Sequence, residues 1–282
     1  MKLKKSKKCV IILKKGVIEM KIYVMTDMEG ISGINTSEQL VSGRSAYGEG
    51  RELLTREINR IARFLKEEGV DEVVVQDGHG SGTNIIWEKL SSDVDLCITG
   101  AVRTRYYRKE IENADGVILL GYHAMAGAAE ALLEHTMSSV RIQNLWLNGE
   151  KSGEVALDAG ILGDMGIPVI MVSGDDKVCA EAGKLLPWAT LACVKESLGL
   201  MTTALLPSHK AEEVLKNAVH DAISRIGEMK PYVISKPVKC KVELTERQPI
   251  PHYANRVSIE FEDARTYTVT ADSVFDAFYG TY

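Results

Sequence analysis

The sequence predicts an α/β fold in which helices flank a mainly parallel sheet, with a smaller C-terminal α+β subdomain. Short apolar segments rich in Val and Ile alternate along the chain with longer segments of helical period, and this alternation is typical of a parallel sheet. After about residue 206 the rhythm changes to one long helix followed by two strands. We therefore expect an α/β domain over 20–206 and a smaller α+β subdomain over 207–282.

Each expected element rests on a local pattern. The strands are expected over 21–25, 73–75, 96–99, 116–120, 140–147, 169–172, 191–195, 238–244 and 256–261, where apolar residues run together or alternate. The helices are expected over 52–68, 85–90, 153–165, 175–186, 208–226 and 273–279. In the first helix, apolar residues recur at steps of four, three and four between Leu54 and Leu65, which places them on one face. Glycines between residues 30 and 50 predict a long loop before it.

Charge and cysteine usage limit the classes of partner and compartment. Residues 1–19 hold seven lysines and one acid, so they carry +6, and residues 20–282 carry −11 of the overall −5. We interpret 1–19 as a basic extension or a mis-called start. The acidic body argues against nucleic acid as a partner, and no apolar run approaches the ~20 residues that span a bilayer. The five cysteines form no CxxC pair, which suits a soluble protein of the reducing cytoplasm.

Metal-ligand chemistry follows three of the expected strands. Asp27 and Glu29 follow the first strand, His79 the second and His123 the fourth. Function in open α/β sheets gathers at the carboxyl ends of the strands, and this set of side chains suits Zn²⁺ or a similar first-row ion. Glu154, at an expected helix start, adds a third carboxylate. One carboxylate that bridges two ions ~3.5–4 Å apart is common in hydrolases, so we expect a two-metal hydrolase.

Each of these residues alone has a simpler interpretation, as a solvated strand end, a turn, a core histidine or an acid in the first turn of a helix. Only their joint placement at strand ends favours a metal site. His135 lies outside the strand ends, and it is either a surface histidine or a proton-transfer group beside the metals. The other three histidines have no ligand-like setting: His209, His220 and His252.

Several motifs, taken in order, resemble the DppA-type zinc D-aminopeptidase family, which comprises binuclear zinc peptidases with an Asp-x-Glu-Gly signature. The motifs are DMEGISG at 27–33, DGH at 77–79, GYHA at 121–124, HTMS at 135–138, GE at 153–154 and PVIMVSGDD at 168–176. The resemblance covers about residues 20–200 in order and the remainder more loosely. The loop between His123 and His135 is about one residue longer than is usual in the family, and residues 1–19 have no counterpart.

The resemblance implies two zinc ions per subunit, with Asp27 as the bridging ligand. It implies the release of N-terminal D-amino acids, such as D-alanine, from short peptides by a decameric ring that encloses its active sites. His135 matches the family's proposed catalytic nucleophile, although neutral imidazole beside two cations is also a usable base. The other zinc ligands that the resemblance implies are Glu29, His79, His123 and Glu154.

Two other functions remain open from the residues alone. A metal-dependent phosphoesterase would use similar carboxylates and histidines, but the candidate ligands bring no clear arginine or lysine clamp. A non-catalytic, metal-dependent peptide-binding ring protein would not need His135. The handedness of the substrate rests on the resemblance alone, because no residue spacing distinguishes a D-alanyl from an L-alanyl group.

Overall fold

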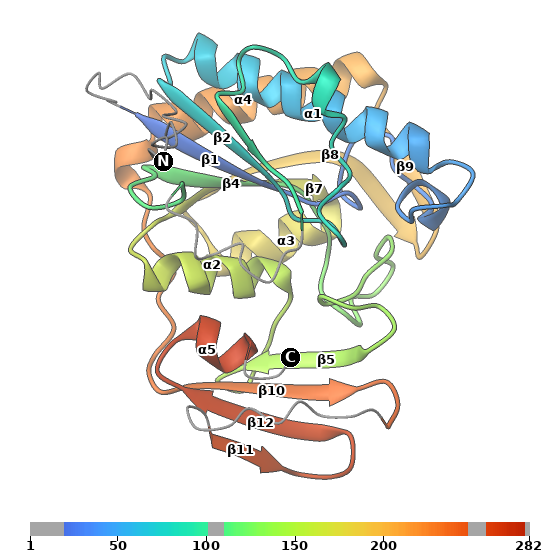
Figure 1. Cartoon of the computed structure of the whole chain (residues 1–282), viewed down its shortest axis with the longest axis vertical. Coiled ribbons are helices and arrows are strands. Elements are labelled where there is room, and N and C mark those ends of the chain that lie inside the picture. The colour runs from blue at the N-terminus through green and yellow to red at the C-terminus, as the bar shows by residue number, and fades with distance from the viewer. Residues whose placement is uncertain (1–19, 101–109, 248–257, 280–282) are drawn as a thin grey trace, which may run out of the picture.

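The computed structural model describes residues 20–100, 110–247 and 258–279, and its larger sheet confirms the expected α/β class. Seven strands lie in the order β3-β2-β1-β4-β7-β8-β9, all parallel except β9, which pairs antiparallel with β8 (Figure 1). The extension over 1–19 lies outside the described residues. The strands are β1 (Lys21–Thr26), β2 (Glu72–Asp77), β3 (Leu96–Ile98), β4 (Gly116–Tyr122), β7 (Val169–Asp175), β8 (Thr190–Gly199) and β9 (Thr202–Leu205).

Helices cover both faces of this sheet, and the strands are apolar on both faces for that reason. In β1, Ile22 and Val24 pack in the core with α1 (Tyr47–Glu67) and α4 (Ser208–Ser224). Tyr23 and Met25 point the other way, into the core that contains α2 (Glu154–Asp164) and α3 (Asp176–Leu185). The alternation follows from the two-residue period of a strand.

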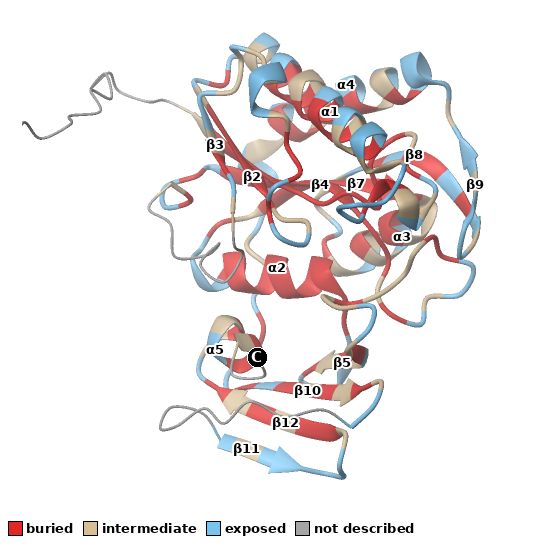
Figure 2. Ribbon diagram, turned by 45° about the vertical axis from the view of Figure 1, so that its right-hand side comes forward, coloured by how far each residue is buried: buried red, intermediate tan, exposed pale blue. Residues whose placement is uncertain are grey.

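A second, antiparallel sheet lies beyond α2 and α5 (Val274–Tyr279) (Figure 1). Its strands, in the order β11-β12-β10-β5-β6, are Ser258–Phe261, Thr266–Ala271, Val238–Leu244, Ile142–Leu147 and Glu150–Lys151. Ten of the eleven residues of α2 are buried, and Figure 2 shows the helix coloured as buried along most of its length. A helix that is covered on both sides has this pattern.

The second layer draws on both parts of the chain. Strands β5 and β6 precede residue 207, whereas α4, which follows it, packs against α1 and β8 of the larger layer. A domain boundary near 207 therefore stays a prediction. None of the helices that the structure describes is long and apolar enough to cross a membrane.

Close backbone contacts join α2 to the segment that leads into β10. A Cβ added at Gly163 would lie 1.9 Å from the carbonyl oxygen of Tyr232, and one added at Gly160 would lie 2.9 Å from the Ile234 side chain. At Gly163 only glycine allows such an approach. The helix is therefore packed tightly against the second layer as well as against the larger sheet.

The strand order creates a crevice at the carboxyl ends of β1 and β4. From β1 the chain adds β2 and β3 on one side and then returns to place β4 on the other. Such a switch point is where ligands bind in open α/β sheets. Thr26 lies opposite both Asp77 and Leu120, and the Asp27 N–H donates to the Leu120 carbonyl at 2.8 Å. This register brings the residues that follow three strands to one edge of the sheet.

Candidate metal centre

The crevice collects all six residues that the sequence singled out. They form two groups whose potential ligand atoms lie within 4.8 Å of one another. The first group comes from the ends of β1 and β2, and the second from the end of β4, the loop after it and the first turn of α2. The groups are Asp27, Glu29 and His79, and His123, His135 and Glu154.

Asp27 connects the two groups. Its Oδ1 lies 2.8 Å from Nδ1 of His79 and its Oδ2 lies 3.5 Å from Nε2 of His123. Glu29 Oε2 lies 3.2 Å from the same His79 nitrogen. The Met28 N–H donates to Asp27 Oδ1 at 2.8 Å, which fixes the rotation of the carboxylate. Two oxygens that face different histidines match the arrangement of a bridging carboxylate in a two-metal site.

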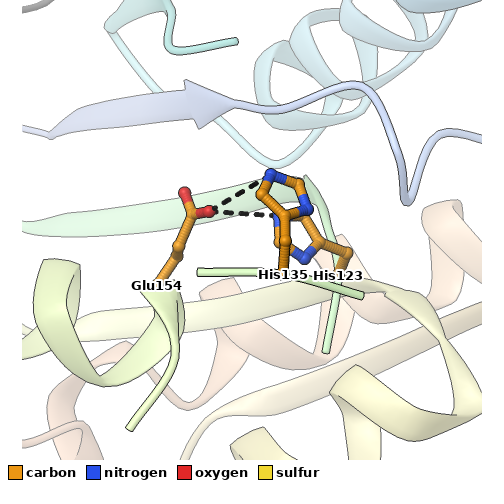
Figure 3. A group of neighbouring side chains, drawn as sticks. All are labelled: His123, His135 and Glu154. Carbon is orange, nitrogen blue, oxygen red and sulfur yellow. Dashed lines mark ion pairs between the residues drawn. The ribbon is translucent and has the colours of Figure 1, made fainter. Parts of the chain in front are cut away.

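The second group converges on one oxygen of Glu154 (Figure 3). Its Oε1 lies 3.2 Å from Nε2 of His123 and 3.8 Å from Nε2 of His135. It also accepts the Met137 N–H at 2.7 Å. The two imidazole rings stack, with centroids 4.1 Å apart and planes 10° from parallel. Because Glu154 is the first residue of α2, the helix dipole also favours its negative charge.

Backbone carbonyls orient the two histidines that lie nearest to Asp27. His79 Nε2 donates to the Leu40 carbonyl at 3.3 Å, and His123 Nδ1 donates to the Ala124 carbonyl at 3.0 Å. A carbonyl can only accept, so in the neutral ring the hydrogen sits on these nitrogens. The other nitrogen of each ring then presents its lone pair to the acids, which is the usual tautomer of a metal-binding histidine.

A backbone carbonyl also orients His135, in a loop that contains residues of positive φ. His135 Nδ1 donates to the Leu133 carbonyl at 2.9 Å, and the Leu133 N–H donates to the Leu200 carbonyl at 3.0 Å. Glu130, Leu133 and Met137 all have positive φ, between 51° and 62°, a conformation that costs a non-glycine residue roughly 1–2 kcal/mol. Surrounding bonds must therefore hold the loop, and they leave Nε2 of His135 as the basic nitrogen.

The acids and histidines strongly alter one another's proton affinity. Burial raises the pKa of Glu29, but the positive charge of His79 outweighs it and holds that pKa well below its usual value. Burial lowers the pKa of His79, but Glu29 and Asp27 outweigh it and hold that pKa well above its usual value. Asp27 and Glu154 likewise outweigh burial at His123 and raise its pKa. The site thus stabilises positive charge.

Two buried polar atoms in the site lack a partner of suitable geometry. Among the described residues, Glu29 Oε2 and His123 Nε2 accept or donate no hydrogen bond, although both face charged groups. Such atoms are rare in folded proteins and call for an explanation. The three carboxylates offer oxygen ligands and the histidines offer nitrogen ligands, a set that fits Zn²⁺ or another first-row ion. The residues present therefore fit a metal pair.

A cleft of about 590 Å³ opens onto this site. Leu40, Val41, Leu133 and Leu200 give it an apolar wall, and Phe278 and Tyr279 of α5 contribute from the second layer. No arginine or lysine is among the described residues that line it. The cleft is therefore built to accept an uncharged or positively charged group beside a cluster of acids.

Comparison with known proteins identifies the family. The sequence profile of the D-aminopeptidase family matches residues 20–281. The chain belongs to the D-aminopeptidase family. A D-aminopeptidase of Bacillus subtilis (strain 168) is 33% identical over 213 residues, which make up 75% of this chain and 77% of that protein.

A solved relative confirms both the resemblance and the fold class. The structure of the Zn-dependent D-aminopeptidase DppA from Bacillus subtilis, described as a self-compartmentalizing protease, matches with a TM-score of 0.83 and 28% sequence identity. The match covers 93% of this chain and 95% of that one. This D-aminopeptidase-family chain therefore has the architecture of the relative over nearly its whole length.

Supporting residues of the site were not predicted from the sequence. Glu181 of α3 accepts the Met125 N–H at 2.8 Å behind His123, and Lys195 of β8 contacts the loop after β1. An acid in an amphipathic helix and a lysine near a strand end usually face solvent, so only an alignment could have marked them. Of the histidines set aside, His220 is exposed and bonded to Glu68, while His252 lies outside the described residues.

Proposed function

We propose that this protein is a binuclear zinc-dependent aminopeptidase that releases N-terminal D-amino acids, such as D-alanine, from short peptides. Membership of the D-aminopeptidase family supports the reaction class. The name of the solved relative supports zinc. The observation that carries the proposal is Asp27, whose two oxygens face His79 in one group and His123 in the other.

Two zinc ions per subunit would share Asp27 as a bridging ligand. Glu29 and His79 would complete the protein ligands on one side, and His123 and Glu154 those on the other, as their positions around Asp27 suggest. When bound, the metal pair would polarise the scissile carbonyl and lower the pKa of an attacking water toward ~7. Glu29, His123 and Glu154 are largely buried, so bulk water would compete little for these positions.

His135 would move the proton. Its Nδ1 hydrogen is committed to the Leu133 carbonyl, so Nε2 has the lone pair that accepts a proton from the attacking water. The protonated ring would then donate to the nitrogen of the departing peptide. Direct attack by Nε2 on the carbonyl, with an acyl-histidine intermediate, is the alternative role, and a covalent adduct on His135 would distinguish it.

The cleft supports a peptide over a phosphate ester. A phosphoesterase needs cationic groups for the phosphoryl oxygens, and the described lining contains no arginine or lysine. A peptide brings apolar groups, which Leu40, Val41 and Leu133 accept. A cleft of about 590 Å³ suits short peptides.

We also propose that the chain assembles into a homo-oligomeric ring, a decamer by resemblance, and works in the cytoplasm. The solved relative is described as self-compartmentalizing. Leu198, Leu200 and Met201 at the β8–β9 turn are each more than half exposed, which is typical of a surface that another chain covers. The described cysteines are free thiols, which suits a reducing compartment.

A paired assay tests the function. Full-length protein is offered D-alanyl and L-alanyl dipeptides of otherwise equal sequence, before and after chelation and after zinc is restored. We expect release of D-alanine only, its loss on chelation and its recovery with two equivalents of zinc. Equal cleavage of the L-peptide would refute the chirality. Hydrolysis of p-nitrophenyl phosphate instead would favour the phosphoesterase, and peptide binding without turnover would favour the binding protein.

A further inference from the structure

A buried ammonium group lies beneath one half of the candidate metal centre. Lys195 of β8 is only 2% exposed, and burial lowers its pKa to about 8. Its Nζ donates to three backbone carbonyls, those of Glu29 at 2.5 Å, Ile31 at 2.9 Å and Ile34 at 2.7 Å. An ammonium has three hydrogens, so all of them are used on one short loop.

The loop has a conformation that needs such a donor. It turns sharply after β1, with an Ile31 N–H bond to the Met28 carbonyl and an Ile34 N–H bond to the Ile31 carbonyl. Ile31 and Ile34 are fully buried as whole residues, so their carbonyls have no access to bulk water. The Ile31 carbonyl also accepts the Ile34 N–H, whereas Lys195 is the donor to the carbonyls of Glu29 and Ile34, and a buried carbonyl without a donor costs free energy. Lys195 removes this cost for both carbonyls with a single ammonium group.

An acid fixes the opposite side of the same loop. Glu57 of α1 is 1% exposed and accepts both the N–H of Ser32, at 3.0 Å, and its hydroxyl hydrogen. Lys195 and Glu57 attract each other, although they reach the loop from different elements. Buried charges are expensive to desolvate. Both side chains bind the segment that carries Glu29. We therefore expect their role to be to fix the conformation of this segment.

We infer that Lys195 is a positioning residue that holds the Glu29 half of the metal centre in its ligand geometry. The inference rests on the proposed function, since it assigns Glu29 to a zinc ion. The Glu29 residue is restrained at its carbonyl by Lys195 and at the following amide by Gly121, to which the Gly30 N–H donates at 2.8 Å. Its carboxylate is thereby directed to His79, where Oε2 lies 3.2 Å from Nδ1.

If Lys195 is removed, its positioning role and its positive charge predict changes in zinc affinity of opposite sign. A positive charge near a metal site repels the metal ion, so its removal alone should tighten zinc binding. Loss of the hydrogen bonds that orient a ligand typically weakens metal affinity by about 10–100-fold. The variant Lys195→Met keeps the length of the side chain and removes both the charge and the donors. The sign of the change in zinc affinity therefore identifies the role.

The experiment titrates metal-free full-length protein with zinc and, separately, with Co²⁺, whose absorption bands report ligand geometry. In Lys195→Met we expect one of two zinc equivalents to bind at least about tenfold more weakly and the Co²⁺ bands of that site to change. The matched control is Val194→Ala on the same strand, whose side chain packs in the core with α1 and α4. It should lower thermal stability without changing either zinc affinity or the Co²⁺ bands.

A milder variant keeps the test decisive if Lys195→Met does not fold. Ser32→Ala removes the hydroxyl that binds Glu57 and so loosens the other side of the loop. It should weaken the same zinc equivalent, and unchanged affinity would overturn the inference. Unchanged or tighter zinc binding by folded Lys195→Met would also overturn it while the proposed function stands. Wild-type protein that binds no zinc would overturn both, and one that binds two equivalents without releasing D-alanine would overturn the function alone.

Discussion

Asp27 is the residue that links the two halves of the candidate centre, because one of its oxygens faces His79 and the other faces His123. Its position comes from the backbone. The Asp27 N–H bonds to the Leu120 carbonyl, which ties the end of β1 to β4. Glu29, two residues further on, lies within ion-pair distance of His79. The two acids should therefore respond differently to substitution.

Asp27→Asn should weaken both zinc equivalents, by about 100-fold or more, because a lost ligand should exceed the 10–100-fold typical of an orienting bond. Glu29→Gln should weaken one equivalent and leave the other. Zinc per subunit after dialysis against a graded chelator measures this. Glu38→Gln, at an exposed acid, is the control and should retain both equivalents. Loss of only one equivalent in Asp27→Asn would contradict the bridging role.

His135→Ala should lower kcat by roughly 10²–10⁴-fold, the usual contribution of a general acid–base group. Zinc content should stay at two equivalents, because the proposed ligands remain. Intact-mass analysis during turnover should detect no acyl adduct on the wild-type protein. His220→Ala removes an exposed histidine and should leave kcat unchanged. A trapped adduct on His135 would establish the nucleophilic role instead.

Chelated protein should depend on pH in a defined direction. The pKa values of His79 and His123 are raised, so their contribution to stability is complete below the unfolded pKa of about 6.5 and is lost as pH rises through the raised values. The pKa values of Asp27, Glu29 and Glu154 are lowered, so theirs is present above about pH 4.5 and is lost as pH falls through the lowered values. The cluster should stabilise the chelated protein most between these limits.

Zinc should show the opposite trend at the alkaline end. Metal binding requires neutral imidazole, so the stabilisation that zinc adds should grow between pH 6 and 8. Urea unfolding at several pH values, with and without zinc, measures both effects. A zinc-induced change in the free energy of unfolding that is constant over this range would contradict the assignment of His79 and His123 as ligands.

The strand-end residues could be predicted because an apolar strand is visible in the sequence and its carboxyl end is where side chains meet. Asp27, Glu29, His79 and His123 are of this kind, and the structure brings them together. His135 could not be placed this way. Its position depends on a loop with three residues at positive φ and on a bond from Leu133 to the distant Leu200, and no local pattern encodes either.

Among the elements, the crossing of the loop after β1 over the end of β4 determines the shape of the site. Gly30 lies against the backbone there, and an added Cβ would come within 2.0 Å of the Tyr122 carbonyl oxygen. The Gly30 N–H also bonds to the Gly121 carbonyl. A side chain at this position would push β1 and β4 apart at the point where Asp27 and His123 face each other.

Gly30→Ala should therefore destabilise the protein by about 1–3 kcal/mol or more, as overpacking does, and should lower zinc affinity as well. Thermal melting and zinc titration measure the two effects. Gly48→Ala is the matched control, because nothing lies within 4 Å of its added Cβ. It sits in the first turn of α1, so alanine should be neutral or slightly stabilising. Equal effects of the two substitutions would contradict the argument.

The expected elements agree with the structure where the sequence pattern is long. They differ where tertiary contacts determine the local conformation. Helix α1 begins at Tyr47 rather than near 52, although it contains Gly48 and Gly50. A Cβ at Gly50 would lie 1.9 Å from the Gln39 carbonyl oxygen, so packing selects glycine in a segment that otherwise reads as a loop. Strands β9, β12 and the two-residue β6 were not expected, and β9 is a mostly exposed edge strand without an apolar run.

At the scale of the whole molecule, the cleft belongs to both layers, and the ring would enclose it. The larger layer supplies the acids and histidines, while Phe278 and Tyr279 come from the second. If the β8–β9 turn is covered by another chain, the Leu200 wall of the cleft lies at a subunit contact. Assembly would then shape the substrate site as well as limit access to it.

Light scattering after size exclusion should give about 310 kDa, ten times the 31.0 kDa of one chain. Charged substitutions of Leu198 and Met201, both exposed, should shift the protein to smaller species and lower peptidase activity, with zinc content unchanged. Substitution of Glu260, exposed on β11, with Lys is the control. A monomer of full activity would contradict the proposed assembly.

The contacts of α2 with Tyr232 and Ile234 have a mechanical consequence. The Gly163 backbone lies against that of Tyr232, and the Ile234 side chain packs on Gly160, so the two layers have little room to slide past each other there without breaking a packed interface. The cleft between them should keep a fixed width through the catalytic cycle. Substrate selectivity would then depend on whether a peptide fits a rigid cleft. The turnover rate should not be limited by domain opening and closing.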